Sequence, residues 1–153
     1  EIPLKDRDNL IEAYRKIFYG DDKDKKLSAA KAWSKWEASC SFINHNPDAV
    51  KESTNSDFAL AFALIENHYF VNKGFLDYEN QLLDNIDIIR DIPSIIIQGR
   101  YDVVCPPTTA YELHSRWQES ELVIAPFSGH SAFEKEITNS SWPRDASSFF
   151  HVG

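Results

Sequence analysis

The stretch that decides the fold reads Ser94-Ile95-Ile96-Ile97-Gln98-Gly99. A short, continuous β-branched run after Pro93 is typical of a parallel strand that is buried on both faces. A second apolar run occupies residues 121–125 and ends at Pro126. The segment between them, from 106 to about 117, opens with prolines and predicts a helix. Strand, helix and strand in this order predict two parallel strands with a right-handed crossover.

The chain upstream of this stretch has helical periodicity instead. Apolar residues recur at helical spacing from Leu10 to Phe18, and Gly20 ends that helix. Next we expect a turn over the charged run 21–26, a helix over about 27–40, a break at 44–48 and a helix over about 56–71. Gly74 is expected to terminate the last helix, because glycine adopts a positive φ at low cost. The sequence therefore predicts a helical region over 1–85 and an α/β region over 86–153.

Composition limits the classes of function. With 153 residues and 42% apolar content, the chain is long enough to bury a core. Its formal charge of −8 argues against nucleic acid and anionic membranes as partners, since both require clustered Lys and Arg. No apolar run approaches the ~18 residues of a membrane span, and the first residues lack the order of a signal peptide. We therefore expect a soluble, cytoplasmic protein.

No metal or cofactor is expected from the sequence. Cys40 and Cys105 are too few for a disulfide framework and lack zinc-site spacing, so we expect two free thiols. The remaining potential ligands also lack a metal-binding spacing; these are His45, His68, His114 and His151.

Two residues with catalytic potential follow the two expected strands. Asp102 comes shortly after Gly99, and His130 comes shortly after Ala125. Ligands of open parallel sheets bind beyond the carboxyl ends of the strands. There, a carboxylate that accepts the Nδ1 proton of a histidine fixes the tautomer and stabilises the imidazolium. Taken singly, an aspartate in this place is more often a turn residue, and such a histidine more often a loop histidine.

The motifs around this pair are more specific than the pair itself. Gly99-Arg100-Tyr101-Asp102 together with Ser128-Gly129-His130-Ser131 resembles the proline iminopeptidase (prolyl aminopeptidase) family of α/β-hydrolases, and Asp before His is the chain order of that fold. The resemblance covers most of residues 5–138 and includes the stretches 29–37, 65–70 and 81–83.

This resemblance implies an α/β-hydrolase fragment, in which 1–85 is the helical cap and 86–153 carries the last strand, helix and strand of a parallel sheet. It implies a serine aminopeptidase that releases N-terminal proline from peptides without a metal or cofactor. Asp102 would be the orienting carboxylate and His130 the general base and acid. Glu37 and Glu66 would bind the free amine of the substrate.

A helical wheel adds an observation on the two glutamates. At about 100° per residue, Glu66 falls inside an apolar arc with Phe62 and Phe70. Glu37 is placed similarly beside Trp33, although a lysine lies near the same face. A carboxylate in an apolar setting is costly unless a cation or hydrogen bonds compensate it. That cation can be a substrate ammonium or a nearby Lys or Arg.

The nucleophile is missing from these residues. A nucleophile elbow has the pattern Gly-x-Ser-x-Gly, and none of the five glycines provides it. Cys105 is discounted as a nucleophile because Pro106 and Pro107 remove amides where oxyanion donors would be needed. The serine is therefore expected from elsewhere, and a truncated gene model, a split enzyme and a fragment all remain open. Segment 140–145 also departs from the family, because a proline interrupts it.

The sequence is compatible with two functions. In the first, the chain supplies the triad Asp and His of a prolyl aminopeptidase and associates with the missing N-terminal half or with itself. In the second, it is a non-catalytic remnant that binds a peptide N-terminus or a partner protein.

Overall fold

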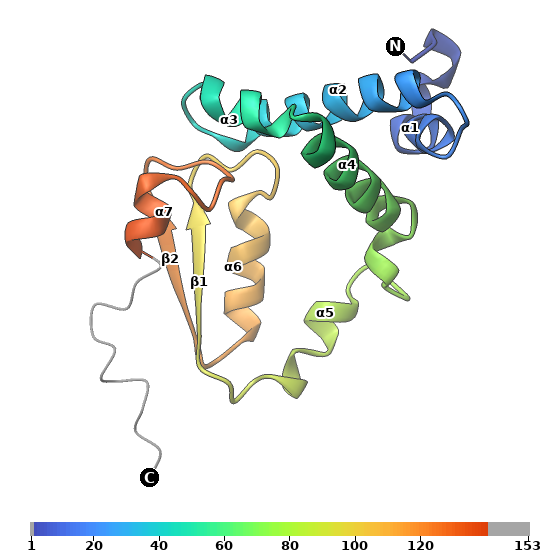
Figure 1. Cartoon of the computed structure of the whole chain (residues 1–153). Helices are drawn as coiled ribbons and strands as arrows, with labels where there is room; N and C mark the ends of the chain where they lie inside the picture. Colours follow the sequence, from blue (N-terminus) through green and yellow to red (C-terminus); the bar gives the residue numbers. More distant parts are fainter. Residues whose placement is uncertain (1, 141–153) are drawn as a thin grey trace. The chain divides into compact units, whose positions relative to one another are not determined.

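The computed structural model describes residues 2–140, which form a mixed α/β protein with a small parallel sheet (Figure 1). Two compact units are present, one of residues 2–39 with 45–81 and the other of residues 40–44 with 82–140. Within the described residues, no helix is both long enough and apolar enough to cross a membrane.

The first unit is helical. It contains a 3-10 helix (Leu4–Asn9), α1 (Leu10–Phe18), α2 (Lys23–Ser41), α3 (Pro47–Ser53), α4 (Ser56–Val71) and a second 3-10 helix (Lys73–Phe75). The last two residues of α2 belong to the second unit. Its core combines Phe18 and Trp33 with alanines from α2 and α4. The rings of Phe18 and Trp33 meet edge to face with centroids 5.9 Å apart, an arrangement that aromatic pairs favour. Small alanines beside these rings allow the helices to approach closely.

The structure corrects two sequence predictions in this unit. The charged run 21–26 is not a turn throughout, because α2 already begins at Lys23. Asp22 explains the early start, since its Oδ1 accepts the N–H of Lys25 at 2.9 Å, as a helix cap does. The predicted break at 44–48 is also two residues late, because α2 ends at Ser41 and α3 begins at Pro47. Pro47 opens α3, and Asn46 caps that helix by accepting the N–H of Ala49 at 3.0 Å.

The end of α4 agrees with the prediction. Gly74 has φ 64° and follows the helix closely. Its neighbours Lys73 and Phe75 also have positive φ, 51° and 61°. Two non-glycine residues in this region make the turn more strained than the glycine alone predicts.

The second unit contains the predicted strand, helix and strand. They are β1 (Ser94–Gly99), α6 (Pro107–Arg116) and β2 (Ser120–Ala125). The strands are parallel, with Ser94 opposite Ser120 and Gly99 opposite Ala125. A short α5 (Gln81–Asp84) and a 3-10 helix (Ile86–Ile88) precede them, and α7 (Lys135–Ser140) follows.

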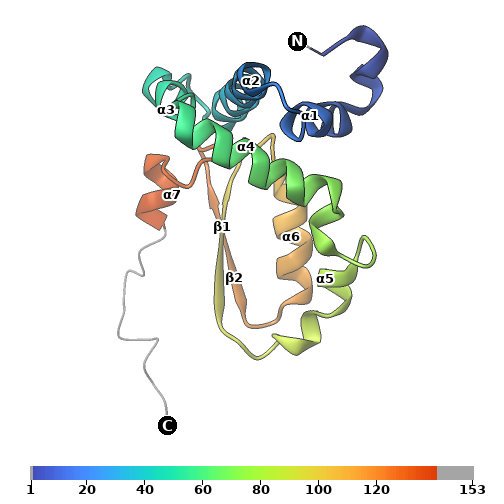
Figure 2. The same cartoon turned by 45° about the vertical axis from the view of Figure 1, so that its right-hand side comes forward.

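Helices α6 and α7 lie against opposite faces of the two strands, as both views show (Figures 1 and 2). The strands are nevertheless less buried than the sequence predicts, because Ile95 and Ile124 are each 37% exposed. Among the described residues each strand has one neighbour, which leaves its other edge uncovered. Ile137 of α7 is buried, whereas most of the divergent segment noted above, from residue 141 onward, lies outside the described residues.

Candidate active site

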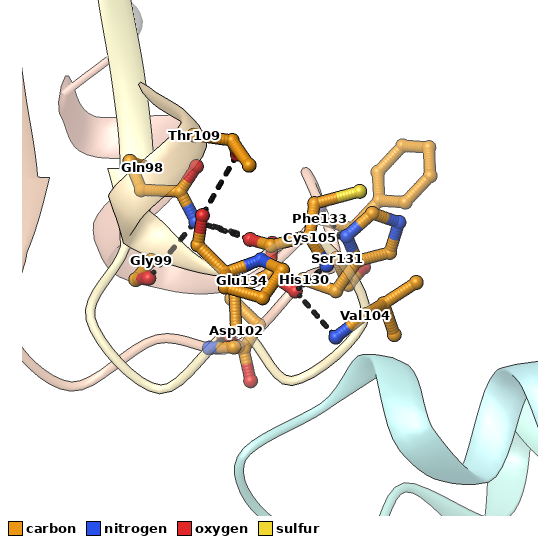
Figure 3. A network of polar contacts seen from close by, with 12 residues as sticks. Gln98, Gly99, Asp102, Val104, Cys105, Thr109, His130, Ser131, Phe133 and Glu134 are labelled. Carbon is orange, nitrogen blue, oxygen red and sulfur yellow. Dashed lines mark hydrogen bonds and ion pairs between the residues drawn. The ribbon is translucent and has the colours of Figure 1, made fainter. Parts of the chain in front are cut away.

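Asp102 lies in the loop after β1, and both of its carboxylate oxygens are engaged (Figure 3). Oδ1 accepts the backbone N–H groups of Val104 at 2.9 Å and Cys105 at 2.8 Å. Oδ2 lies 3.0 Å from Nδ1 of His130. The aspartate is buried, while the imidazole side chain is 37% exposed. The structure thus brings together the two residues that the sequence placed after neighbouring strands.

The environment of Asp102 favours its charged form. Burial by itself raises the pKa of this carboxyl, but the hydrogen bond from the Cys105 amide, the hydrogen bond and charge of His130, and the Val104 amide outweigh it. The pKa of Asp102 therefore lies below its ordinary value of 3.8. A carboxylate only accepts hydrogen bonds, so Nδ1 of His130 carries the proton between them. In the neutral ring, Nε2 is then the nitrogen that can accept a proton.

Backbone contacts join the Asp loop to the His loop. The N–H of Tyr101 donates to the carbonyl oxygen of Ser128 at 2.9 Å, and the N–H of Arg100 donates to that of Ala125 at 3.0 Å. An ideal Cβ at Gly99 would lie 1.9 Å from the carbonyl oxygen of Gly129. Glycine at position 99 is therefore what allows the two loops to approach.

The 40–44 segment fixes the His loop from a distant part of the sequence. The carbonyl oxygen of Ser41 accepts the N–H groups of His130 at 2.9 Å and Ser131 at 2.7 Å. Glu134 connects the same pieces, because its Oε1 accepts the N–H of Ile43 at 2.8 Å and its Oε2 accepts the N–H of Gly129. The position of His130 is thus set by four backbone amides with defined acceptors.

Gln98 is a further member of the site. It is buried at the end of β1, and its Nε2 lies 3.2 Å from Oδ2 of Asp102. The sequence analysis missed Gln98, Ser41 and Glu134. A signal for Gln98 was present, because a glutamine follows three isoleucines in the predicted strand. Nothing local in the sequence distinguished Ser41 or Glu134.

The two glutamates expected to bind an amine lie in the first unit. Glu66 is half-buried on α4, and its Oε2 accepts the indole N–H of Trp33 from α2 at 2.6 Å. Glu37 is half-buried on α2. The structure thus places Glu66 beside the indole of Trp33, which gives one of its oxygens a neutral donor.

Within 2–140, no group of three or more His, Cys, Asp or Glu side chains is arranged to hold an ion. His151, one of the histidines considered in the sequence, lies outside that range. Cys40 and Cys105 form no disulfide.

An Asp and a His brought together by the ends of adjacent parallel strands have the geometry of the orienting half of a catalytic triad. The sequence is also similar to those of known proteins. The chain is 50% identical over 135 residues to the proline iminopeptidase of Xanthomonas citri, which covers 88% of the chain and 43% of that protein.

Other proline iminopeptidases are similar over the same extent. The Arabidopsis thaliana protein is 47% identical over 138 residues, covering 90% of the chain and 36% of that protein. The Neisseria gonorrhoeae protein is 42% identical over 133 residues, covering 87% and 41%. No family model matches the chain. The resemblance to proline iminopeptidases is therefore confirmed, and the chain spans less than half the length of these relatives.

Proposed function

We propose that the chain is the part of a serine α/β-hydrolase that contributes the Asp and His of the triad, and that the complete protein releases N-terminal proline from peptides. The observation that carries this proposal is the contact between Asp102 Oδ2 and His130 Nδ1 at the ends of two parallel strands. The similarity to proline iminopeptidases supports the choice of substrate.

The chemistry follows from the protonation states. Nε2 of His130 takes the proton of a serine hydroxyl as that oxygen attacks the carbonyl carbon of the N-terminal prolyl residue. The same proton then passes to the leaving amine as the amide bond breaks. Water, activated in the same way, hydrolyses the prolyl ester. Asp102 stays ionised throughout and stabilises the imidazolium. The serine is supplied by residues outside these 153, because the chain has no Gly-x-Ser-x-Gly segment.

Glu37 and Glu66 are proposed to bind the cationic amine of the substrate. The indole of Trp33 donates a hydrogen bond to one oxygen of Glu66, and this neutral donor brings no positive charge. A half-buried carboxylate is a suitable partner for a secondary ammonium group. No cofactor takes part in this mechanism.

The proposal is tested with the purified chain and with a longer protein, reconstructed so that these residues follow a Gly-x-Ser-x-Gly segment and called the longer protein below. The longer protein should hydrolyse a proline naphthylamide and be labelled by a fluorophosphonate, whereas the 153-residue chain should do neither. Labelling of a serine within the chain would show that the nucleophile has been misplaced. If the longer protein binds peptides with an N-terminal proline but does not cleave them, a non-catalytic binding role replaces the enzymatic one.

A further inference from the structure

The amide nitrogen of Gln98 is surrounded by oxygen atoms. Nε2 lies 3.1 Å from the carbonyl oxygen of Gly99, 3.1 Å from that of Cys105 and 3.2 Å from Oδ2 of Asp102 (Figure 3). A carbonyl oxygen and an ionised carboxylate can only accept hydrogen bonds. The orientation of the Gln98 amide is therefore defined, since the reverse orientation would point its own oxygen at these three.

Two of these acceptors mark the ends of the loop that carries Asp102. Gly99 is the last residue of β1, and Cys105 immediately precedes the prolines that lead into α6. By donating to both carbonyl groups, Gln98 closes the loop across its base. The two N–H bonds of the amide are shared among three acceptors, so at least one of them is bifurcated.

The third acceptor is Oδ2 of Asp102, the oxygen that contacts His130. The amides of Val104 and Cys105 donate to Oδ1 alone, so they do not fix the position of Oδ2. Gln98 donates to Oδ2, the oxygen that faces Nδ1 of His130. Its hydrogen bond thus restricts the oxygen whose position decides whether the Asp–His contact forms.

Gln98 is buried, so its amide depends on partners within the protein. Gln98 is 9% exposed at the end of a strand that is otherwise rich in isoleucine. Burying an amide without partners costs more than burying an apolar side chain of the same size. A glutamine in this place is therefore stabilised by its acceptors, and these acceptors all belong to the Asp loop.

We propose that Gln98 is a positioning residue that sets the loop and the carboxylate of Asp102 so that Oδ2 receives the Nδ1 proton of His130. Its catalytic consequence rests on the proposed hydrolase function, but its structural consequence does not. Loss of the Gln98 amide should release Oδ2, and the proton of the neutral imidazole should then no longer be confined to Nδ1.

The test is the tautomer of His130, measured by ¹⁵N NMR on the full chain with labelled histidine, in solution or under magic-angle spinning. The unmutated chain should show the proton on Nδ1, and the signal is assigned by its loss in His130→Ala. Gln98→Met has a similar size but no N–H, and it should show a substantial population protonated at Nε2. An unchanged tautomer in a folded Gln98→Met chain would overturn the proposal.

Two further variants and one measurement make the test specific. Thr109→Val removes a hydrogen bond to the carbonyl of Pro106 at the start of α6 without touching Asp102, and it should keep the Nδ1 tautomer. Gln98→Glu differs in one atom and should lose the tautomer as Gln98→Met does. Should neither Gln98 variant fold, the side-chain amide protons of Gln98 in the unmutated chain decide. Slow exchange with solvent supports the three contacts, and fast exchange contradicts them.

Kinetics in the longer protein separate this inference from the proposed function. If that protein is a prolyl aminopeptidase, Gln98→Met should lower kcat by about 10²-fold with a small effect on KM, as a displaced catalytic group does. A protein without peptidase activity would contradict the proposed function alone. A changed tautomer with an unchanged kcat would show that Gln98 positions Asp102 without affecting the reaction, and would overturn its catalytic part.

Discussion

Gly99 and Gly129 contact each other through backbone atoms alone. The carbonyl oxygen of Gly129 lies where the first side-chain carbon of any other residue at position 99 would be, 1.9 Å from an ideal Cβ, and that of Ser128 lies at 2.7 Å. Because these atoms are backbone rather than flexible side chain, they cannot rotate away. The separation of the Asp loop from the His loop is therefore set by the absence of a side chain.

Gly99→Ala should force the two loops apart. We expect a loss of about 1–3 kcal/mol in the free energy of unfolding, as for other overpacked sites, measured by denaturant titration. Gly20→Ala is the control, because its added Cβ would come no closer than 3.2 Å to a carbonyl oxygen. Equal stability of the two variants would contradict the close approach.

Stability should depend on the ionisation of Asp102. Its pKa is lower in the folded chain than its ordinary value of 3.8, so its contribution to stability is present above that value. The contribution is lost as the pH falls through the lower pKa of the folded state. The difference in unfolding free energy between the unmutated chain and Asp102→Asn should therefore be constant above about pH 5 and shrink below about pH 4. A constant difference down to about pH 2 would rule this out.

In the longer protein, removal of either member of the pair should abolish most of the turnover. Asp102→Asn and His130→Ala should each reduce kcat by about 10⁴-fold, by analogy with other triads. His114→Ala serves as a matched control, since His114 bonds the hydroxyl of Ser120 at 2.8 Å and has no proposed role in the reaction. Steady-state kinetics on a proline naphthylamide measure all three.

The charge of Glu66 should matter more than its hydrogen bond. Glu66→Gln can still accept the indole N–H of Trp33 but cannot pair with an ammonium group. We expect a loss of about tenfold or more in kcat/KM, equivalent to ~1.5 kcal/mol, for substrates with a free N-terminal amine. Glu37→Gln should act in the same direction. Equal cleavage of free and N-acetylated peptides by the unmutated protein would refute the role of both.

The purified chain should not remain a monomer by itself. Its two-stranded sheet leaves an open edge on each strand among the described residues, and Ile95 and Ile124 are partly exposed beside those edges. Such edges pair readily with other chains. Light scattering should therefore detect association. A monodisperse species of 17.6 kDa that unfolds in one cooperative transition would contradict this expectation.

The sequence predicted the second unit more accurately than the first. A β-branched run bounded by proline and glycine leaves few alternatives, and β1 has the expected ends. The first turn of α2 was missed because a run of alternating charges resembles a solvated loop. It is helical because Asp22 caps it, which depends on a single side chain-to-backbone bond.

The Asp–His pair was predictable because the carboxyl ends of neighbouring parallel strands must meet. The contacts that set its geometry were not. Ser41 acts through its carbonyl oxygen, a group that every residue possesses. Glu134 accepts amides from two segments far apart in the sequence. Such contacts follow from tertiary structure and leave no local pattern.

The two amides that donate to the carbonyl of Ser41 make the site depend on a segment far away in the sequence. The α/β unit is discontinuous, since residues 40–44 belong to it although the helical unit surrounds them in the chain. A polypeptide begun at residue 82 would contain the side chains of Asp102 and His130 but would leave the N–H groups of His130 and Ser131 without their acceptor. One contiguous stretch therefore does not contain the whole site, and a graft onto another scaffold would also need residues 40–44, the end of α2 and the loop that follows it.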